Sequence, residues 1–425
     1  MAKYLSYKRR AIASIAISWG AAIGLSALLA VPALAATETI LHTFTGEPDG
    51  YSGYYPQTFN LIEDPAGNLY GVTPYGGFYD WGMVFELSLQ DGAWVETMLH
   101  SFGAPGDGGV PEGSLIMDKA GNLYGVLEGY KLGGVGAVYE LSPDGKGNWT
   151  ETILTPQRDV HEPFGGLALD ADGNLYGVTQ LGGSLCQTKP KPKLRCGVVF
   201  ELSPPAKGAK KEKWKYTVIH DFLGQNYGDG QWPNGNLILD GAGNLYGTTQ
   251  YGGAYNKGTA FELSPGPDGW TEAILHDFGS FAGDGLIPFF ASLTSDIGGN
   301  LYGTTWQGGS SGGGTVFELS PNGGSWTETV LYSFSGNIYP MAPVTFYNSK
   351  LYGTTFYGGT ANRGTVFELS LSGGVWIEKI LYSFGGAPGD GEEPNSGVIP
   401  DSQGNLFGVT GGGADYAGIV YKISQ

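Results

Sequence analysis

The 425-residue chain has little cysteine, little positive charge and no long helical pattern. Its two cysteines exclude a disulfide-rich scaffold, and no CxxC pair or Cys/His spacing of a zinc site occurs. The 22 Lys and Arg stand against 40 Asp and Glu, which gives a net charge of −18. Such acidity argues against nucleic acid and anionic membranes as partners. Beyond residue 36 no window keeps a 3.6-residue apolar period, which argues against a helical protein.

Glycine, in contrast, accounts for 75 residues, and aromatic residues make up 13% of the chain. This composition is typical of short strands joined by tight turns. No phosphate-binding loop and no dinucleotide fingerprint is present. The segment Gly308–Gly312 matches G-x-S-x-G, but it lies in a glycine-rich hairpin and not in the strand-to-helix turn that a nucleophile elbow needs. No cofactor is therefore predicted.

Residues 1–35 differ from the rest of the chain. Lys3, Lys8, Arg9 and Arg10 precede an uncharged apolar run, and Ala33-Leu34-Ala35 fits a small-residue cleavage site. This pattern predicts a secretory signal peptide, with an uncleaved membrane anchor as the alternative. Cleavage would leave residues 36–425 with a net charge of −18 − 4 = −22. We expect the mature protein to be secreted, periplasmic or on the cell surface.

The mature sequence repeats one pattern, seen most clearly in Gly299–Ser320: GNLYGTT, a double glycine, a variable loop and a run ending FELS. The leucine of the first run recurs at Leu69, Leu123, Leu175, Leu245, Leu301, Leu351 and Leu406. One strand-like run precedes each GNLY, and a W-T-E-x-x-L type run follows most units. Four short strands in each repeat predict an all-β fold, a seven-bladed β-propeller with four-stranded blades over residues 36–425.

The two ends of the mature chain predict how the ring closes. Thr37–Phe44 resembles a fourth strand, whereas the chain ends with Tyr421–Ser424, which resembles a third strand. The last blade would therefore lack its outer strand unless the N-terminal run supplies it. Because this exchange buries edges that would otherwise be exposed, we expect the N-terminal strand to close the last blade in a monomer.

The repeat GNLYGTT-x-x-GG…GTVFELSP…WTE-x-L resembles the GloVer tandem-repeat family, the choice-of-anchor secreted bacterial repeat proteins. The resemblance covers nearly the whole mature chain. More loosely, the pattern is similar to kelch and NHL-type propellers. The family resemblance implies export and surface display, and it brings no established activity.

Loops between the second and third strands, and between the fourth strand and the next blade, share one face, which we call the top face. These loops are long and varied, and binding residues concentrate on such loops. Flat aromatic rings stack on sugars, although the same aromatics could pack between blades. The predicted ligand-binding residues are Tyr75, Trp81, Tyr130, Trp232, Tyr251, Tyr255, Trp306, Tyr357, Arg195 and Arg363.

The third unit departs from the repeat. Arg158, His161 and Glu162 stand where other units carry Gly-Asp-Gly, and a His/Glu pair can act as acid and base in a lyase or hydrolase. Its second loop is bounded by Cys186 and Cys196. Export makes a disulfide between them the expected state, with two free thiols as the alternative.

Four histidines occupy one repeat position on the fourth strand: His42, His100, His220 and His276. Because neighbouring copies of the outermost strand lie well over about 10 Å apart, they cannot share an ion. No metal site is predicted from them.

The sequence favours a non-enzymatic, extracellular binding or interaction module that takes a glycan or protein ligand on its top face. The first alternative is a lyase or hydrolase of an extracellular polymer, centred on His161 and Glu162. The second is a purely structural surface protein. No nucleic acid partner is expected, and no membrane contact beyond the export signal.

Overall fold

The computed structural model describes residues 36–45, 60–105, 107–128, 136–155, 160–183, 185–186, 194–206, 213–413 and 417–425. The predicted signal peptide, Tyr130 and Arg158 lie outside these residues, as do the side chains of Cys186 and Arg195. Ala35–Gln425 forms one compact unit. Within the described part of the chain, no helix is both long and apolar enough to cross a membrane.

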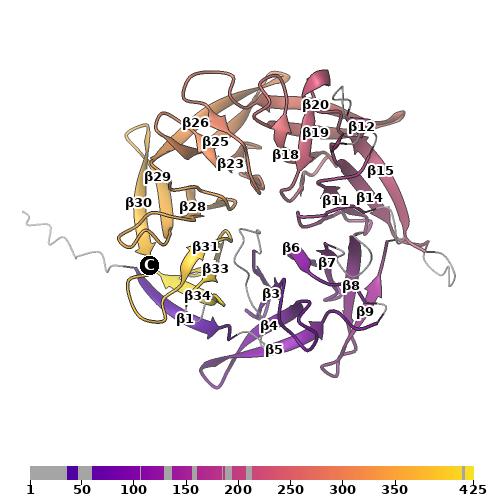
Figure 1. The fold of residues 1–425 in the computed structure, drawn as a ribbon, viewed down its shortest axis with the longest axis vertical. Coiled ribbons are helices and arrows are strands. Elements are labelled where there is room, and N and C mark those ends of the chain that lie inside the picture. The colour runs from indigo at the N-terminus through magenta and orange to yellow at the C-terminus, as the bar shows by residue number, and fades with distance from the viewer. Residues whose placement is uncertain are drawn as a thin grey trace, which may run out of the picture. The chain divides into compact units, whose positions relative to one another are not determined.

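Seven antiparallel sheets surround a central axis, which confirms the predicted seven-bladed propeller (Figure 1). Within each blade the strands run from the axis outward in sequence order. Blade 1 contains β2 (Ile62–Glu63), β3 (Leu69–Thr73), β4 (Met83–Gln90) and β5 (Ala93–Ser101). Blade 2 contains β6 (Pro111–Met117), β7 (Leu123–Leu127), β8 (Ala137–Pro143) and β9 (Trp149–Ile153). Blade 3 contains β10 (Ala168–Leu169), β11 (Leu175–Thr179), β14 (Val198–Ser203) and β15 (Lys215–Asp221).

In the later blades the innermost strand is often split into two short pieces. Blade 4 contains β16 (Gly230–Pro233), β17 (Ile238–Leu239), β18 (Leu245–Gly252), β19 (Thr259–Gly266) and β20 (Gly269–Asp277). Blade 5 contains β21 (Gly285–Leu286), β22 (Thr294–Ser295), β23 (Leu301–Thr305), β24 (Gln307–Gly308), β25 (Gly312–Asn322) and β26 (Ser325–Ser335). Blade 6 contains β27 (Thr345–Tyr347), β28 (Lys350–Thr355), β29 (Thr365–Ser372) and β30 (Val375–Ser383).

Blade 7 joins the two ends of the chain. It contains β31 (Glu392–Pro394), β32 (Ile399–Pro400), β33 (Leu406–Gly412) and β34 (Ile419–Ser424), and its outer strand is β1 (Thr37–Thr43). β1 pairs antiparallel with β34, from Thr37 opposite Ser424 to Thr43 opposite Ile419. This pairing confirms that the N-terminal strand closes the last blade.

The LYG strands are buried along their whole length because neighbouring blades cover both of their faces. All five residues of β23 are buried, for example. A Cβ atom on its central Gly303 would lie 2.6 Å from the ring of Phe317 on β25. Every blade repeats this contact between the glycine and the aromatic residue of the FELS strand. The conserved position within the repeat therefore needs glycine for close packing, as its place in a strand predicts.

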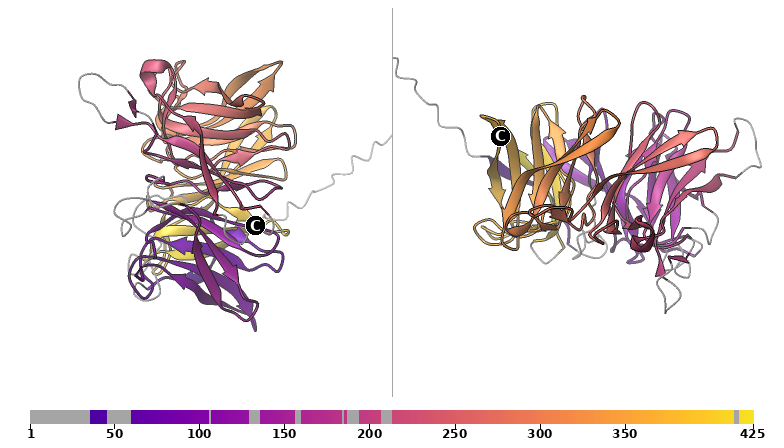
Figure 2. Two further views of the ribbon diagram at one scale, coloured as in Figure 1. Left: turned by 90° about the vertical axis from the view of Figure 1, so that its right-hand side faces the viewer. Right: turned by 90° about the horizontal axis from the view of Figure 1, so that it is seen from above.

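The turns between the first and second strands are held by one aspartate each. In blade 5, Asp296 Oδ1 accepts hydrogen bonds from the amides of Gly298 and Asn300, and Oδ2 accepts from Asn300 Nδ2 and the Tyr302 hydroxyl. Asp170 makes the same set of bonds in blade 3. The Asp-x-x-Gly-Asn segments are therefore structural turns. Since neighbouring strands are antiparallel, the loops between the second and third strands and the crossings into the next blade emerge on the opposite, top face (Figure 2).

Candidate functional site: the inner ring of the top face

Equivalent residues surround the axis at the points where the chain passes from the outer strand of one blade to the innermost strand of the next. Each of these residues precedes a proline and has a left-handed backbone, although none is glycine. We call them the inner ring: Val110, Glu162, Trp232, Ile287, Tyr339 and Glu393. A left-handed backbone costs free energy for such residues, and it persists only where the surroundings hold it firmly. The varied side chains at a fixed backbone position make the ring a suitable place for recognition.

Backbone hydrogen bonds hold the inner ring on both sides. Ile287 shows the pattern: its amide donates to the carbonyl of Lys257 in the preceding blade, and its carbonyl accepts from the amide of Trp306 in its own blade. Val110 makes the same two bonds, with the carbonyl of Trp81 and the amide of Glu128. The ring residues are therefore fixed on a rigid scaffold, which favours a preformed site over one that orders on binding.

Aromatic side chains from blades 3, 5 and 6 form a continuous row. Trp306 lies at its centre, with ring centroids 5.6 Å from Phe289 and 5.6 Å from Tyr339. The row continues from Phe289 to Phe290 at 4.3 Å and from Tyr339 to Tyr357 at 6.1 Å. Phe164 and Phe356 extend it at either end. We call these residues the aromatic sector.

The aromatic sector contains a hydrogen-bond donor that the described residues do not use. Trp306, Tyr339 and Tyr357 are half-buried, so part of each ring faces solvent. Trp306 Nε1 is buried and has no acceptor among the described residues. Trp232 Nε1 is in the same state, and its indole packs edge-on against Tyr251 at 5.4 Å. A buried indole N–H normally has a hydrogen-bond acceptor. The two indole N–H groups that lack one therefore mark positions where a ligand oxygen or a water molecule would be held.

Two residues of the inner ring, Glu162 and Glu393, are acidic. Burial raises the pKa of the Glu162 carboxyl above its ordinary value. Burial, together with the charge of Glu162, also raises the pKa of Glu128. The Glu162 backbone carbonyl accepts a hydrogen bond from the Gln180 amide. The two carboxyls interact electrostatically, and the negative charge of Glu162 favours the protonated form of Glu128.

The structure brings some of the predicted site residues together. Trp306 and Tyr357 belong to one row through Tyr339, and Trp232 meets Tyr251. Glu162 lies in the inner ring, and His161 pairs through its backbone with Leu181 in the adjacent loop.

Other predicted residues lie apart from this cluster. Tyr75 and Tyr255 are exposed on outer loops, at 46% and 51% of their surface. Trp81 packs against the core between blades 1 and 2. Arg363 forms an ion pair with Glu392 at 2.8 Å and approaches Glu393 at 3.9 Å, which places it beside the acidic end of the inner ring.

The cysteine loop of blade 3 forms a small hairpin of its own. β12 (Leu185–Cys186) pairs with β13 (Leu194–Arg195), with Cys186 opposite Leu194. Cys196 is buried and disulfide-bonded. Its bond to Cys186 stays a prediction, because the Cys186 side chain lies outside the described residues.

The opposite face has a cavity of about 340 Å³ between blades 4 and 5. Asp240 and Asp296 line it, together with Ile297, which is fully exposed. Both aspartates are already engaged in holding their turns. The cavity is therefore a gap between two structural turns, and it contains none of the predicted site residues.

Sequence reasoning missed Phe289, Phe290, Tyr339 and Glu128. The signal that could have found them is the X-Pro dipeptide that recurs after each fourth strand, as in Ile287-Pro288 and Tyr339-Pro340. Aligning the repeats on that proline places the variable residue at one position around the axis.

These features define the protein as a seven-bladed β-propeller with a rigid, partly aromatic inner ring. The chain belongs to the Gloeobacter/Verrucomicrobia repeat family, whose model matches residues 29–211 and 192–342. This finding confirms the family resemblance. No curated protein matches the chain.

Solved structures share the fold at low sequence identity. A puromycin-hydrolyzing peptidase of Mycobacterium tuberculosis is 12% identical with a TM-score of 0.51, over 90% of this chain and 55% of that one. A Dyadobacter fermentans protein of unknown function is 12% identical with a TM-score of 0.41, over 88% and 96%. The Xanthomonas campestris gluconolactonase XC5397 is 13% identical with a TM-score of 0.39, over 75% and 85%. At these identities the likeness concerns the fold alone.

Proposed function

We propose that the protein is an exported binding module that holds an extracellular polysaccharide on the aromatic sector. The observation that carries this proposal is the setting of Trp306. Its ring lies between Phe289 and Tyr339, and its buried Nε1 has no acceptor among the described residues. Half-exposed rings offer flat apolar surface to a sugar ring, while indole N–H groups can donate to its hydroxyl oxygens.

The charge of the protein narrows the ligand. The chain carries a net charge of −18, and the inner ring adds Glu162 and Glu393 beside the aromatic sector. Polyanionic polysaccharides would be repelled, whereas neutral or amino-substituted sugars would be accepted. We therefore expect a neutral or cationic polysaccharide.

The test is a binding screen of the purified protein against neutral, cationic and anionic polysaccharides, followed by isothermal calorimetry on a hit. Trp306→Ala and Trp232→Ala should each weaken binding at least about tenfold. Phe78→Ser is the matched control, because Phe78 is 76% exposed outside the inner ring. Equal losses in all three variants would show non-specific adhesion. A ligand that binds the Trp306→Ala variant with unchanged affinity would refute the proposed site. A protein ligand whose binding depends on Trp306 would refute the proposal that the ligand is a polysaccharide.

A second candidate, a hydrolase or lyase of the bound polymer, is favoured by the raised pKa values of the adjacent carboxyls Glu128 and Glu162. One carboxyl would act as acid and the other as base. Product release from the polysaccharide hit, lost in Glu162→Gln while binding is retained, would establish it. Binding without product release would leave the non-enzymatic module.

A further inference from the structure

Three interfaces between neighbouring blades contain the same group of side chains. Each group joins a histidine at the end of one outer strand, an aspartate from the loop that follows, and a glutamate from the outer strand of the next blade. The three sets are His100, Asp107 and Glu151; His220, Asp229 and Glu272; and His276, Asp284 and Glu328. Within each set one ligand atom from every residue lies within 4.8 Å of the others. We call these sets the interblade triads.

In the His220 triad, the distances between the imidazole nitrogen and the two carboxylate oxygens match those between the ligand atoms of one metal ion. They are longer than ordinary hydrogen bonds. His220 Nε2 lies 3.8 Å from Asp229 Oδ1 and 3.5 Å from Glu272 Oε1. Two donors about 2.1 Å from a tetrahedral ion are about 3.4 Å apart. Both His220 Nε2 and Glu272 Oε1 are buried atoms without a hydrogen-bond partner among the described residues. Buried polar atoms of this kind need an explanation, and an unplaced ion is one of the established ones.

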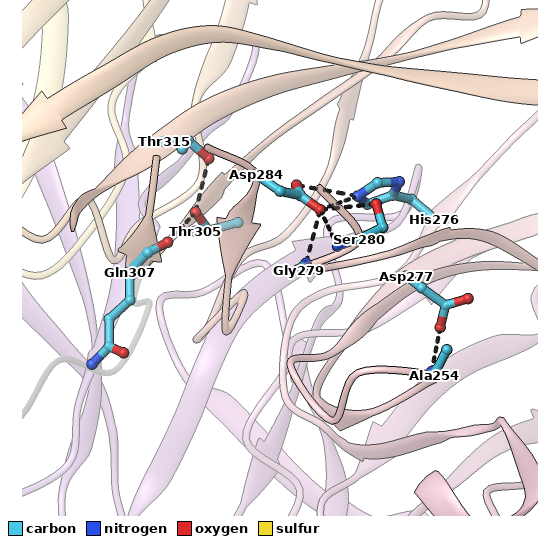
Figure 3. Close-up of polar contacts among 9 residues, drawn as sticks. All are labelled: Ala254, His276, Asp277, Gly279, Ser280, Asp284, Thr305, Gln307 and Thr315. Carbon is cyan, nitrogen blue, oxygen red and sulfur yellow. Dashed lines mark hydrogen bonds and ion pairs between the residues drawn. The ribbon is translucent and has the colours of Figure 1, made fainter. Parts of the chain in front are cut away.

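The His276 triad shows a fully held aspartate beside an unsatisfied glutamate. Asp284 accepts hydrogen bonds from the amides of Gly279 and Ser280 at 2.8 Å, and it lies 3.1 Å from His276 Nε2 (Figure 3). Glu328 reaches this group from the next blade, and both of its buried carboxylate oxygens lack a hydrogen-bond partner among the described residues. A bare carboxylate is thus poorly accommodated there.

The same chain provides an internal comparison at two other interfaces. Tyrosine replaces histidine in blades 5 and 6, and there its hydroxyl reaches the glutamate directly. Tyr332 donates to Glu378 Oε2 at 2.7 Å, and Tyr382 donates to Glu38 Oε2 at 3.0 Å. At the first of these interfaces both oxygens of Glu378 are absent from the set of buried atoms without a partner, whereas Glu38 keeps one such oxygen, Oε1. Histidine, the shorter side chain, leaves the glutamate unsatisfied.

The histidine and the glutamate of a triad are also replaced together. Where Thr155 stands in place of the histidine in blade 2, Tyr216 stands in place of the glutamate in blade 3. By sequence, His42 and Glu96 occupy the histidine position of blade 7 and the glutamate position of blade 1. Among the described residues, His100, His220 and His276 each lie beside both carboxylates.

We propose that each interblade triad binds a divalent transition-metal ion of the Zn²⁺ class and so links the outer strands of two neighbouring blades. One imidazole nitrogen and two carboxylates form a mixed donor set that suits Zn²⁺ and Mn²⁺ better than Ca²⁺ or Mg²⁺, which prefer oxygen alone. The ion neutralises two carboxylates that otherwise repel each other across the interface. The overall net charge of −18 favours cation uptake further.

The test measures the metal content and stability of the purified protein after removal of any affinity tag and dialysis against chelator. Calorimetry with ZnCl₂ should give at least three bound Zn²⁺ per chain, and Zn²⁺ should raise the unfolding temperature. Co²⁺ should give the visible absorption bands of a tetrahedral or five-coordinate site. Glu272→Gln and His220→Tyr should each remove one equivalent, or weaken one site at least about tenfold.

The matched control is Glu378→Gln, at an interface that has tyrosine and no triad. It should leave the Zn²⁺ stoichiometry unchanged. His220→Tyr also guards against misfolding, because it copies the Tyr332–Glu378 interface that the fold already contains. Three results would overturn the proposal: no Zn²⁺ bound above one equivalent, a stoichiometry unaffected by Glu272→Gln, or a stability that responds to pH and not to metal. The last would show that the triads share only a proton.

Discussion

The hydroxyl of Tyr332 donates a 2.7 Å hydrogen bond to the carboxylate of Glu378 across the boundary between blades 5 and 6. Burial raises the pKa of Glu378, and the bond from Tyr332 opposes that rise. This pair satisfies a glutamate on the outer strand with a tyrosine hydroxyl, and we propose that a metal ion takes that role in the interblade triads. The outer edges of neighbouring blades are thus joined by polar contacts in addition to the apolar packing further in.

Removing the Tyr332 hydroxyl should weaken one blade interface. Tyr332→Phe leaves the Glu378 carboxylate partly buried without its donor, and we expect a loss of about 1–3 kcal/mol in the free energy of unfolding. Urea unfolding followed by fluorescence measures it. Tyr227→Phe is the control, since Tyr227 is 57% exposed. Equal stability of both variants would show that Glu378 finds another partner.

The glycine of the LYG strands should not tolerate a methyl group. In Gly303→Ala the new Cβ would lie 2.6 Å from Phe317 and 3.0 Å from Leu293, so we expect a loss of about 1–3 kcal/mol. Thermal unfolding compares it with Gly241→Ala, where nothing lies within 4 Å of the new atom. Introducing Phe317→Leu into the Gly303→Ala variant should recover part of the loss. Additive losses in this double variant would contradict the steric explanation.

Deleting residues 36–45 should open the ring. The deletion exposes the whole edge of β34 and removes Phe44, which is fully buried against Phe85 at 5.4 Å. An unpaired edge strand invites pairing with another chain. Light scattering should therefore show self-association and calorimetry a lowered unfolding temperature. Moving residues 36–45 to a position after Gln425 should restore the monomer, and a monomeric deletion variant would contradict the closure argument.

Glu38 should make the stability of the protein fall between mildly acidic and neutral pH. Burial and the nearby Asp390 raise its pKa from 4.5 to about 7, against the hydrogen bond from Tyr382. The folded state then holds a proton that the unfolded state has released, so the stabilising contribution is complete below pH 4.5 and is lost as the pH rises through 7.

Glu38→Gln should flatten this part of the stability profile. The gain in free energy at pH 8 should be on the order of 1 kcal/mol, because solvent screening reduces the full value of the pKa shift. Chemical unfolding at pH 4.5, 6 and 8 gives the comparison. An unchanged slope in the variant would assign the pH dependence to other groups.

The sequence determined the fold because each repeat contains the residues that specify its own strands and turns. Glycine in LYG, the Asp and Asn of the first turn, and the unmatched fourth strand at Thr37–Phe44 all act locally or through one pairing. Their effects can be predicted from one repeat, and the same structure then follows for every blade. The predicted positions of Trp306 and Tyr357 on the top face followed from the same topology.

Only the tertiary structure decided which side chains meet across blades. Trp306 and Tyr339 are separated by 33 positions in sequence (339 − 306) and belong to different loops, yet their rings lie 5.6 Å apart. His220 and Glu272 come from different repeats and lie close together. Considering only the distances between equivalent histidines of neighbouring blades could not reveal this contact. The physical reason is that repeat periodicity specifies what every blade shares. The proposed recognition and ion binding depend instead on differences between blades and on the angle at which neighbouring blades pack.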